Sequence, residues 1–346
     1  MSTFVSEVLK SVAKGETLDA STAEAFMNRM MTGETTPIQT AGLLAAMAVR
    51  GETVDEIVGF ARAMRKHSLS LDISYEVVDT CGTGGDGADT FNISTAAAFV
   101  SAAAGVPIAK HGNRAVSSRS GSADVLQALG ARIDLNEYEA TQCLAETNLC
   151  FLFAPSYHPA MKHAVEPRKQ LGFRTIFNIL GPLTNPAGAN RQVLGVFRAD
   201  LVAKVASALA ALGTKHALVV HGAGGIDELS LAGETLVAEV KDGVVTEYRV
   251  SPSEFGLQTS SLDAVVGGDS AFNADILRNV LNGATGPHRD VVVLNACAVL
   301  YVGGRVESIA EGVALANRVI DGGAAKQTLE KFIRFTHQVT QAEVAQ

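Results

Sequence analysis

Three polar loops between residues 78 and 124 carry the residue types that bind phosphate. The first, residues 82–86, is the glycine loop and follows Val77-Val78-Asp79, which we interpret as the end of a buried parallel strand. Glycines adopt backbone angles that are closed to other residues, so that successive N–H groups can turn onto one anion. The loop consists of Gly82, Thr83, Gly84, Gly85 and Asp86. It therefore predicts a phosphate-binding turn.

The second loop predicts the start of a helix. Asn92, Ser94 and Thr95 stand directly before an alanine-rich run that stops at Gly105, and we expect Ser94 or Thr95 to be its N-cap. The first turn of a helix has free N–H groups and a positive dipole end, and both favour a bound phosphate. This helix start is the second predicted anion site.

The third loop follows a predicted strand at residues 106–109. It contains Lys110, His111, Asn113 and Arg114, and a serine-rich helix start at residues 117–124 that includes Ser122 comes next. Open α/β sheets bind ligands at the edge where the carboxyl ends of their strands meet. We therefore expect the three loops to lie together.

Each loop also has a purely structural explanation. A glycine cluster after a strand is more often a tight turn, Lys110 and Arg114 also fit solvated surface charge, and Ser122 also fits a simple helix cap. A structural turn, however, needs no charged and amide side chains at successive strand ends. The combination indicates a site for a phosphorylated substrate.

Two adjacent acids, Asp227 and Glu228, follow an apolar run and a glycine-rich stretch at residues 219–225. Carboxylate oxygens are the hard ligands that Mg²⁺ prefers, with water and substrate phosphate completing its octahedron. Paired acids on loops are usually solvated, so by themselves they are a weak sign of a metal site.

Composition argues against a protein that binds polynucleotides. The chain of 346 residues has a formal net charge of -8, and only 18% of its residues are charged. It therefore has no global basic field, and its lysines and arginines act locally. With 47% hydrophobic residues it can build a substantial core, in two domains or in one large domain with an appendage.

The cysteines and the apolar runs indicate a cytoplasmic protein. Cys81, Cys143, Cys150 and Cys297 lack CxxC or other metal-ligand spacing, which suggests reduced thiols, and we interpret Cys81 as small buried filler rather than a nucleophile. Residues 1–14 do not resemble a secretory signal. The longest apolar run, residues 95–109, is too short to span a membrane.

The first seventy residues predict four helices. Two apolar stripes end at Gly15 and Gly33, and capping-box sequences at Thr36 and Thr53 begin two more helices. Such a bundle must pack on another part of the chain, and its remaining apolar stripes would suit a dimer interface.

From Tyr75 onward, strands alternate with helices, which predicts an α/β fold with a central, mostly parallel sheet flanked by helices. Asp242-Gly243 predicts a hairpin turn. We expect the last helical stretch, residues 312–339, to be a surface element. The other expected elements are helices at 201–212 and 274–282, strands at 217–220 and 291–294, and hairpin strands at 236–240 and 244–250.

These motifs together resemble the anthranilate phosphoribosyltransferases of tryptophan biosynthesis. The resemblance covers nearly the whole chain and is very specific. It is carried by GTGGD at 82–86, NIST at 92–95, KHGNR at 110–114, SGSAD at 120–124, FAP at 153–155, HPAMK at 158–162, RTIFN at 174–178, LGPLTNP at 180–186, HG at 221–222 and DE at 227–228.

The resemblance implies a nucleoside phosphorylase-like, class IV phosphoribosyltransferase fold. Residues 1–70 would form a helical domain, completed by helices around 168–184, through which homodimers form, and residues 71–346 would form the α/β domain. The implied reaction is the Mg²⁺-dependent transfer of the 5-phosphoribosyl group of 5-phosphoribosyl 1-pyrophosphate (PRPP) to the amine of anthranilate, the second step of tryptophan biosynthesis from chorismate. Two Mg²⁺ ions per subunit are expected.

The same resemblance implies roles for individual residues. His111 and Arg168 would be catalytic, with Arg168 engaging the anthranilate carboxylate and His111 either a weak base or a neutral loop-holding histidine. The PRPP site would consist of Gly82, Gly84, Gly85, Asp86, Thr90, Asn92, Ser94, Thr95, Lys110 and Ser122. The anthranilate site would consist of Gly82, Asn113, His158 and Arg168, with His111 lining the same side. The metal ligands would be Ser94, Asp227 and Glu228.

One departure and two alternatives bear on this interpretation. The family usually has Pro-Val-Arg where this chain has Glu166-Pro167-Arg168, so the proline is shifted by one position toward the arginine. A pyrimidine nucleoside phosphorylase would share the fold, but the acid pair and the complete glycine loop suit a metal-bound diphosphate better. A non-catalytic nucleic-acid-binding relative would need a basic groove and a degraded loop.

Overall fold

The computed structural model describes residues 3–115 and 118–343, so Ser117 of the predicted serine-rich helix start lies outside the described residues. The chain begins with four helices, as predicted: α1 (Thr3–Ala13), α2 (Ala20–Met31), α3 (Pro37–Arg50) and α4 (Val54–Lys66). Both predicted capping boxes form, because the N–H groups of Gln39 and Glu56 each donate to the threonine hydroxyl at 3.3 Å. These reciprocal bonds satisfy helix-end groups that would otherwise lack partners.

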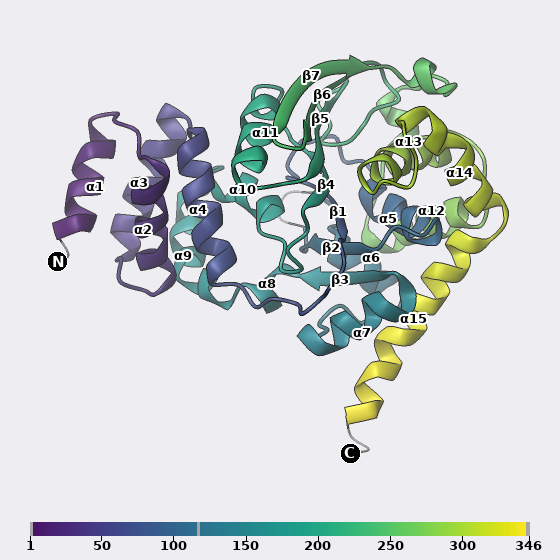
Figure 1. Ribbon diagram of the computed structural model, residues 1–346, viewed down its shortest axis with the longest axis horizontal. Helices are drawn as coiled ribbons and strands as arrows, with labels where there is room; N and C mark the ends of the chain where they lie inside the picture. Colours follow the sequence, from purple (N-terminus) through teal and green to yellow (C-terminus); the bar gives the residue numbers. More distant parts are fainter. Residues whose placement is uncertain (1–2, 116–117, 344–346) are drawn as a thin grey trace.

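The four helices form a bundle with a later segment of the chain (Figure 1). Helix α9 (Lys162–Leu171) packs against α2 and α3, after the short α8 (Ala154–Tyr157) and the 3₁₀ turn η1 (Pro159–Met161). Phe26, Met30 and Leu43 are fully buried in the bundle core. Helix α4 also packs on α11 (Leu201–Ala211), so the bundle core continues onto one face of the sheet.

The sheet has seven strands in the order β3-β2-β1-β4-β5-β6-β7, of which β1 to β5 are parallel and β6 and β7 are antiparallel. The mostly parallel sheet and the hairpin at Asp242-Gly243 are therefore as predicted. The strands are β1 (Val78–Gly82), β2 (Ile108–Gly112), β3 (Leu149–Phe153), β4 (Arg191–Gly195), β5 (His216–Gly222), β6 (Thr235–Lys241) and β7 (Val244–Val250).

Alternation along the strands divides the core into two layers. Ala217 and Val219 of β5 belong to the core that faces α11 and the bundle, whereas Leu218 and Val220 belong to the core on the opposite face. Successive strand side chains point to opposite faces, which explains this division. The helices of the second face are α5 (Ile93–Ala103), α12 (Ser270–Leu281), α13 (Pro287–Val302), α14 (Ile309–Asp321) and α15 (Ala324–Glu343), seen on the right of Figure 1.

One prediction about elements is wrong. Residues 291–294 lie inside α13 and not in a strand, because this helix is buried on almost every side and its apolar run has no helical period to distinguish it. The last helical stretch lies at the surface, as predicted, but it is two helices separated at Gly322-Gly323, and Phe332 and Thr336 lie on the buried face of the second. The remaining elements are α6 (Ser122–Ala128), α7 (Glu137–Thr147), α10 (Phe177–Leu180), and the 3₁₀ turns η2 (Gly181–Leu183), η3 (Pro252–Phe255) and η4 (Leu262–Val265).

Candidate active site

The glycine loop lies directly against the acid pair. Strand β1 runs to Gly82, three residues beyond the predicted end at Asp79, and a side chain at Gly82 would overlap the carboxylate of Asp227. Gly84 and Gly85 have φ values of +69° and +74°, which favour glycine, and the Gly84 N–H donates to Asp227 Oδ2 at 2.7 Å. Two segments far apart in the chain thus form one surface.

Helix α5 begins two or three residues earlier than predicted, depending on which of the two N-cap candidates is compared. Its N-cap is Asn92, not Ser94 or Thr95, and the Asn92 side chain makes no capping hydrogen bond. Ser94 is therefore inside the first turn, where its N–H group lacks an intrahelical partner and donates to Glu228 Oε1 at 3.1 Å. Thr95 is buried, and within the described chain its hydroxyl has no hydrogen-bond partner.

The third loop is joined to the second by side chains. Asn92 Nδ2 donates to the carbonyl of Ser120 at 3.0 Å, and the Ser122 hydroxyl donates to the carbonyl of Asn113 at 3.3 Å. Asn113 Oδ1 in turn accepts from the N–H of Arg114 at 2.7 Å. The structure therefore brings together the three loops that were predicted to converge.

Lys110 and Arg114 have different environments. Lys110 is buried, and its ammonium group donates to the carbonyl of Thr80 and, at 3.3 Å, to the Ser94 hydroxyl. A solvated lysine would not have this position, so Lys110 is part of the site. Arg114 is exposed and pairs with Asp124 at 2.9 Å, which agrees with surface charge.

Three carboxyl groups gather at the acid pair. Asp86 Oδ2 accepts from the Asp227 N–H at 3.3 Å. Burial, then the charges of Asp86 and Glu228, raise the pKa of Asp227 well above its usual value. Burial raises the pKa of Glu228 to about 7, although the Lys110 charge opposes this shift. Buried carboxyl groups that raise one another's pKa fit a cation.

The acid pair does not form a complete metal cage by itself. Across residues 3–115 and 118–343, no three His, Cys, Asp or Glu side chains are arranged to hold a metal ion. This fits Mg²⁺, which binds through one or two carboxylates and keeps water and substrate phosphate as its other ligands.

Two buried histidines lie side by side next to these loops. The ring centroids of His111 and His158 are 5.1 Å apart, and His111 Nδ1 is 3.1 Å from the carbonyl of Gly181. Among the described atoms, neither Nε2 has a hydrogen-bond partner. Burial lowers the pKa of His111 to about 3 and that of His158 to about 4, so both rings are neutral at neutral pH.

Arg168 lies in α9, on the side of the bundle. Residues 162–171 are helical although Pro167 is inside the helix, so the shifted proline does not break the backbone here. The Arg168 guanidinium stacks over the Phe177 ring at 4.9 Å, and burial lowers its pKa. In the described part of the chain, no hydrogen bond joins the Arg168 side chain to the three loops.

Comparison with known proteins agrees with this geometry. Residues 6–68 match the helical bundle domain of a glycosyl transferase family, and residues 74–326 match its a/b domain. The chain is 53% identical over 334 residues to the anthranilate phosphoribosyltransferase of Rubrobacter xylanophilus, covering 96% of this chain and 98% of the relative. The chain belongs to the anthranilate phosphoribosyltransferase family.

Solved anthranilate phosphoribosyltransferases have the same fold. The crystal structure from Thermus thermophilus has a TM-score of 0.90 and 46% identity, covering 95% of this chain and 99% of that one. The Saccharomyces cerevisiae enzyme in complex with PRPP and Mg has a TM-score of 0.89 and 28% identity, covering 98% and 99%.

Arg174 contacts the glycine loop, although it was not among the predicted site residues and only its motif, RTIFN at 174–178, was noted. Its guanidinium donates to the carbonyl of Gly85 and stacks over the Phe197 ring at 4.3 Å. The N–H of Phe197 donates to the Thr83 hydroxyl at 3.1 Å. Arg174 therefore holds the glycine loop from the segment that follows α9, and motif membership was the signal available for it.

Two buried polar residues were also missed. Asp79 is fully buried in β1, and its Oδ1 accepts from the His111 N–H at 3.1 Å, which ties two neighbouring strands beneath the site. Asn273 in α12 contacts Asn92, and no sequence motif surrounds it. Cys81 is buried, with a pKa that burial raises well above its usual value, so the interpretation as filler agrees with the structure.

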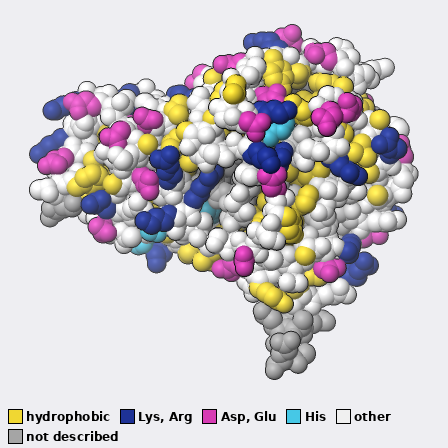
Figure 2. All heavy atoms as spheres, viewed as in Figure 1, with side chains coloured by type: hydrophobic (Ala, Val, Ile, Leu, Met, Phe, Trp, Pro, Cys, Tyr) yellow, Lys and Arg dark blue, Asp and Glu magenta, His cyan; other side chains and the backbone are white. Residues whose placement is uncertain are grey.

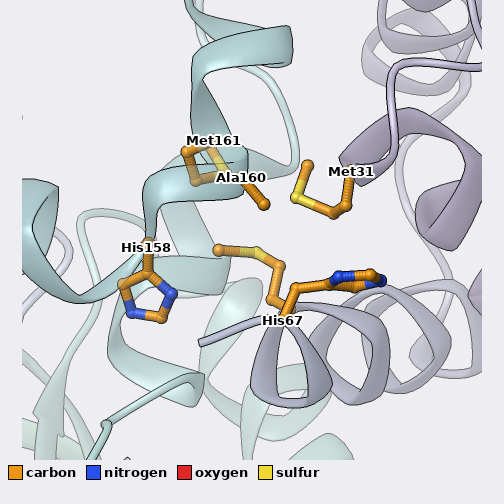
Figure 3. A pocket seen from close by; sticks show the side chains of 6 residues that line it. Met31, His67, His158, Ala160 and Met161 are labelled. Atoms are coloured by element: carbon orange, nitrogen blue, oxygen red, sulfur yellow. The ribbon is translucent and has the colours of Figure 1, made fainter. Parts of the chain in front are cut away.

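A narrow pocket separates the bundle from the segment that carries His158 (Figure 3). His158 and His67 lie on opposite sides of it, and Met31 and Met161 face each other across it. Met64 and Ala160 complete the lining. Methionine is flexible and polarisable, so this boundary can adapt if the bundle and the sheet move relative to each other.

The face shown in Figure 2 does not resemble a polynucleotide-binding surface. On the face in Figure 2, basic and acidic side chains are intermingled and form no continuous basic track. No helix among the described residues is long and apolar enough to cross a membrane.

Proposed function

We propose that this chain transfers the 5-phosphoribosyl group of PRPP to the amine of anthranilate, as the second step of tryptophan biosynthesis from chorismate. In this reaction the anthranilate nitrogen forms a bond to C1 of the ribose while the bond from C1 to the pyrophosphate oxygen breaks. Pyrophosphate leaves with the electron pair of that bond, and the new secondary amine loses a proton. The observation that carries the proposal is the convergence of the glycine loop, the start of α5 and the acid pair in a member of this family.

The PRPP end of the site is assigned to groups that donate hydrogen bonds or carry positive charge. The glycine loop offers backbone N–H groups, the first turn of α5 offers its N–H groups and dipole, and Lys110 offers a buried charge. These groups would stabilise the negative charge that develops on the departing pyrophosphate. We assign Gly82, Gly84, Gly85, Asp86, Thr90, Asn92, Ser94, Thr95, Lys110 and Ser122 to this end.

Mg²⁺ would be held by Asp227 and Glu228, with oxygen from Ser94, and we propose two ions per subunit. When bound there, the metal supplies positive charge to the diphosphate. The raised pKa values of the acid pair support a bound cation. The N–H groups of Gly84 and Ser94 donate to these two carboxylates and so fix them beside the glycine loop, where they would hold the ion.

The anthranilate end is assigned to the bundle side. Arg168 would bind the carboxylate through two parallel hydrogen bonds, and Gly82, Asn113, His111 and His158 would line the amine. An aromatic amine is nucleophilic without prior loss of a proton, so only a weak base is needed. A neutral His111 with a pKa near 3 suits that limited role, and its Nδ1 contact with Gly181 fixes the ring.

Two assembly features complete the proposal. We propose that residues 1–70, completed by helices around 168–184, form one domain and residues 71–346 the other, and that a homodimer forms through the bundle. Ile38 and Val49 of α3 are 85% and 91% exposed, which supports an interface there.

Four buried free thiols support a reducing, cytoplasmic location.

The decisive experiment is the loss of anthranilate fluorescence after enzyme is added to anthranilate and PRPP, with Mg²⁺ present or replaced by chelator. A magnesium-dependent decay is expected. Folded protein that gives no decay would contradict the proposal. In that case phosphorolysis of uridine and thymidine and retention on heparin at low salt test the phosphorylase and nucleic-acid alternatives.

A further inference from the structure

Asn92 is held by a chain of three hydrogen bonds that begins far away in the sequence. The Gly268 N–H donates to Asn273 Oδ1 at 2.7 Å, and Asn273 Nδ2 donates to Asn92 Oδ1 at 3.0 Å. Asn92 Nδ2 then donates to the Ser120 carbonyl at 3.0 Å. Asn92 and Asn273 are 181 residues apart, and Asn273 is only 2% exposed.

The direction of this chain is determined by its two ends. A backbone N–H can only donate and a backbone carbonyl can only accept, so Gly268 and Ser120 orient both amides between them. If Asn92 were flipped, its oxygen would face the Ser120 carbonyl, another acceptor. Asn273 therefore selects the orientation in which Asn92 bonds to the third loop.

A short backing segment, residues 265–268, supports the same place. Val266 forms an antiparallel bridge with Thr90, and the Gly267 N–H donates to the carbonyl of Asp89 at 2.7 Å. A side chain at Gly267 would come within 2.7 Å of the Phe91 backbone and 2.6 Å of Asn273 Oδ1. Residues 89–91, which follow the glycine loop, are thus packed closely against this segment.

We propose that Asn273 is a positioning residue for the phosphoribosyl donor. It touches no substrate itself. It acts through Asn92, which it orients so that the start of α5 and Ser120 keep their relative positions. This inference rests on the proposed function, which assigns Asn92 and Ser122 to PRPP.

The test is the pair of variants Asn273→Asp and Asn273→Ser. Aspartate keeps the shape and accepts from Gly268 but cannot donate to Asn92, and serine removes the amide without adding a charge. Losing one buried hydrogen bond and leaving its partner unsatisfied costs about 1–3 kcal/mol, which corresponds to an effect of about 5- to 150-fold. We therefore expect the KM for PRPP to rise about tenfold or more, with the KM for anthranilate unchanged within about twofold.

A merely structural role would give a different result. It would lower the melting temperature and the fraction of active enzyme but leave both KM values unchanged. Asn148→Asp is the matched control, because Asn148 Nδ2 donates to the Ala102 carbonyl at 2.9 Å near the opposite end of α5. A folded Asn273 variant with a wild-type KM for PRPP would overturn the proposal.

A double-mutant cycle with Asn92→Ala tests the route of the effect. If Asn273 acts through Asn92, Asn273→Ser should add little to the KM for PRPP in the Asn92→Ala background. Multiplied effects would overturn the inference. Failure of the proposed function would appear separately, as wild-type enzyme that does not consume anthranilate.

Discussion

The N–H of Gly84 donates to Asp227 Oδ2 at 2.7 Å, although 143 residues separate the two in the chain. Strand order explains this contact, because in the described sheet β4 alone lies between β1 and β5. The loops that follow β1 and β5 therefore emerge at the same edge of the sheet. Under the proposed function, this bond joins the donor-binding loop to the metal-binding acids.

Gly82→Ala should lower kcat/KM for PRPP by at least about a hundredfold, because the new methyl group would displace the Asp227 carboxylate. Steady-state kinetics at saturating Mg²⁺ measure this. Gly42→Ala is the control, since a side chain there meets nothing within 4 Å. Normal kinetics in Gly82→Ala would show that the tight contact is not needed.

Arg168→Ala should raise the KM for anthranilate far more than the KM for PRPP, by about tenfold to a hundredfold, because a charge-assisted bidentate pair is lost. Kinetics with each substrate varied separately measure the two constants. Lys169→Ala, at the exposed neighbouring position, should leave both constants unchanged. Equal effects on the two substrates would contradict the assignment of Arg168.

Arg174→Ala should raise the KM for PRPP about tenfold, because the Gly85 carbonyl loses a charged donor and the glycine loop loses a support. Arg198→Ala is a close control, since Arg198 lies over the same Phe197 ring at 5.8 Å but pairs with Asp200. If both variants behave alike, ring stacking and not the loop contact is responsible.

Glu228→Gln should reduce activity at saturating Mg²⁺ by at least about a hundredfold, because the amide is a poor ligand for this ion. The same change removes a buried carboxyl whose charged form is disfavoured, so without metal the variant should melt at the same temperature or higher. Differential scanning calorimetry with chelator measures this, and Glu247→Gln on exposed β7 is the control. A large loss of stability in Glu228→Gln without metal would contradict this account.

His111 and His158 should each make the protein less stable as pH decreases from 7.5 to 5, because their pKa values are depressed to about 3 and about 4 in the folded state. The unfolded chain binds protons near pH 6.5 that the folded chain does not, so each histidine removes about 2 kcal/mol over this range. The acid pair opposes this loss, because burial raises the pKa of Glu228 to about 7 and that of Asp227 well above its usual value, so the folded chain gains protons there over the same range. Glu239, with a pKa of about 2, contributes only below about pH 4.5.

Urea unfolding at several pH values measures this dependence. Between pH 7.5 and 5, the free energy of unfolding of His158→Gln should change by about 2 kcal/mol in the stabilising direction relative to the parent chain, which is the share of one histidine. An unchanged slope in this variant would mean that His158 titrates normally in the folded protein.

Local patterns predicted the elements whose chemistry is contained in a few neighbouring residues. Thr36 and Thr53 form their capping boxes because both partners lie within one turn. Asp242-Gly243 forms its hairpin because positive φ values cost these residue types little conformational free energy. The local pattern gave a wrong prediction for residues 291–294, because an apolar run of this kind fits a buried helix as well as a strand.

The sequence by itself determined which residue types stand at the ends of the strands, and so the predicted phosphate loops, the acid pair and the family resemblance. Only the tertiary structure decided that Asn92 is the N-cap of α5, that Arg174 holds Gly85, and that Asn273 orients Asn92. The physical reason is that these relationships depend on strand order and helix packing. They join residues up to 181 positions apart, for which no local period or motif exists.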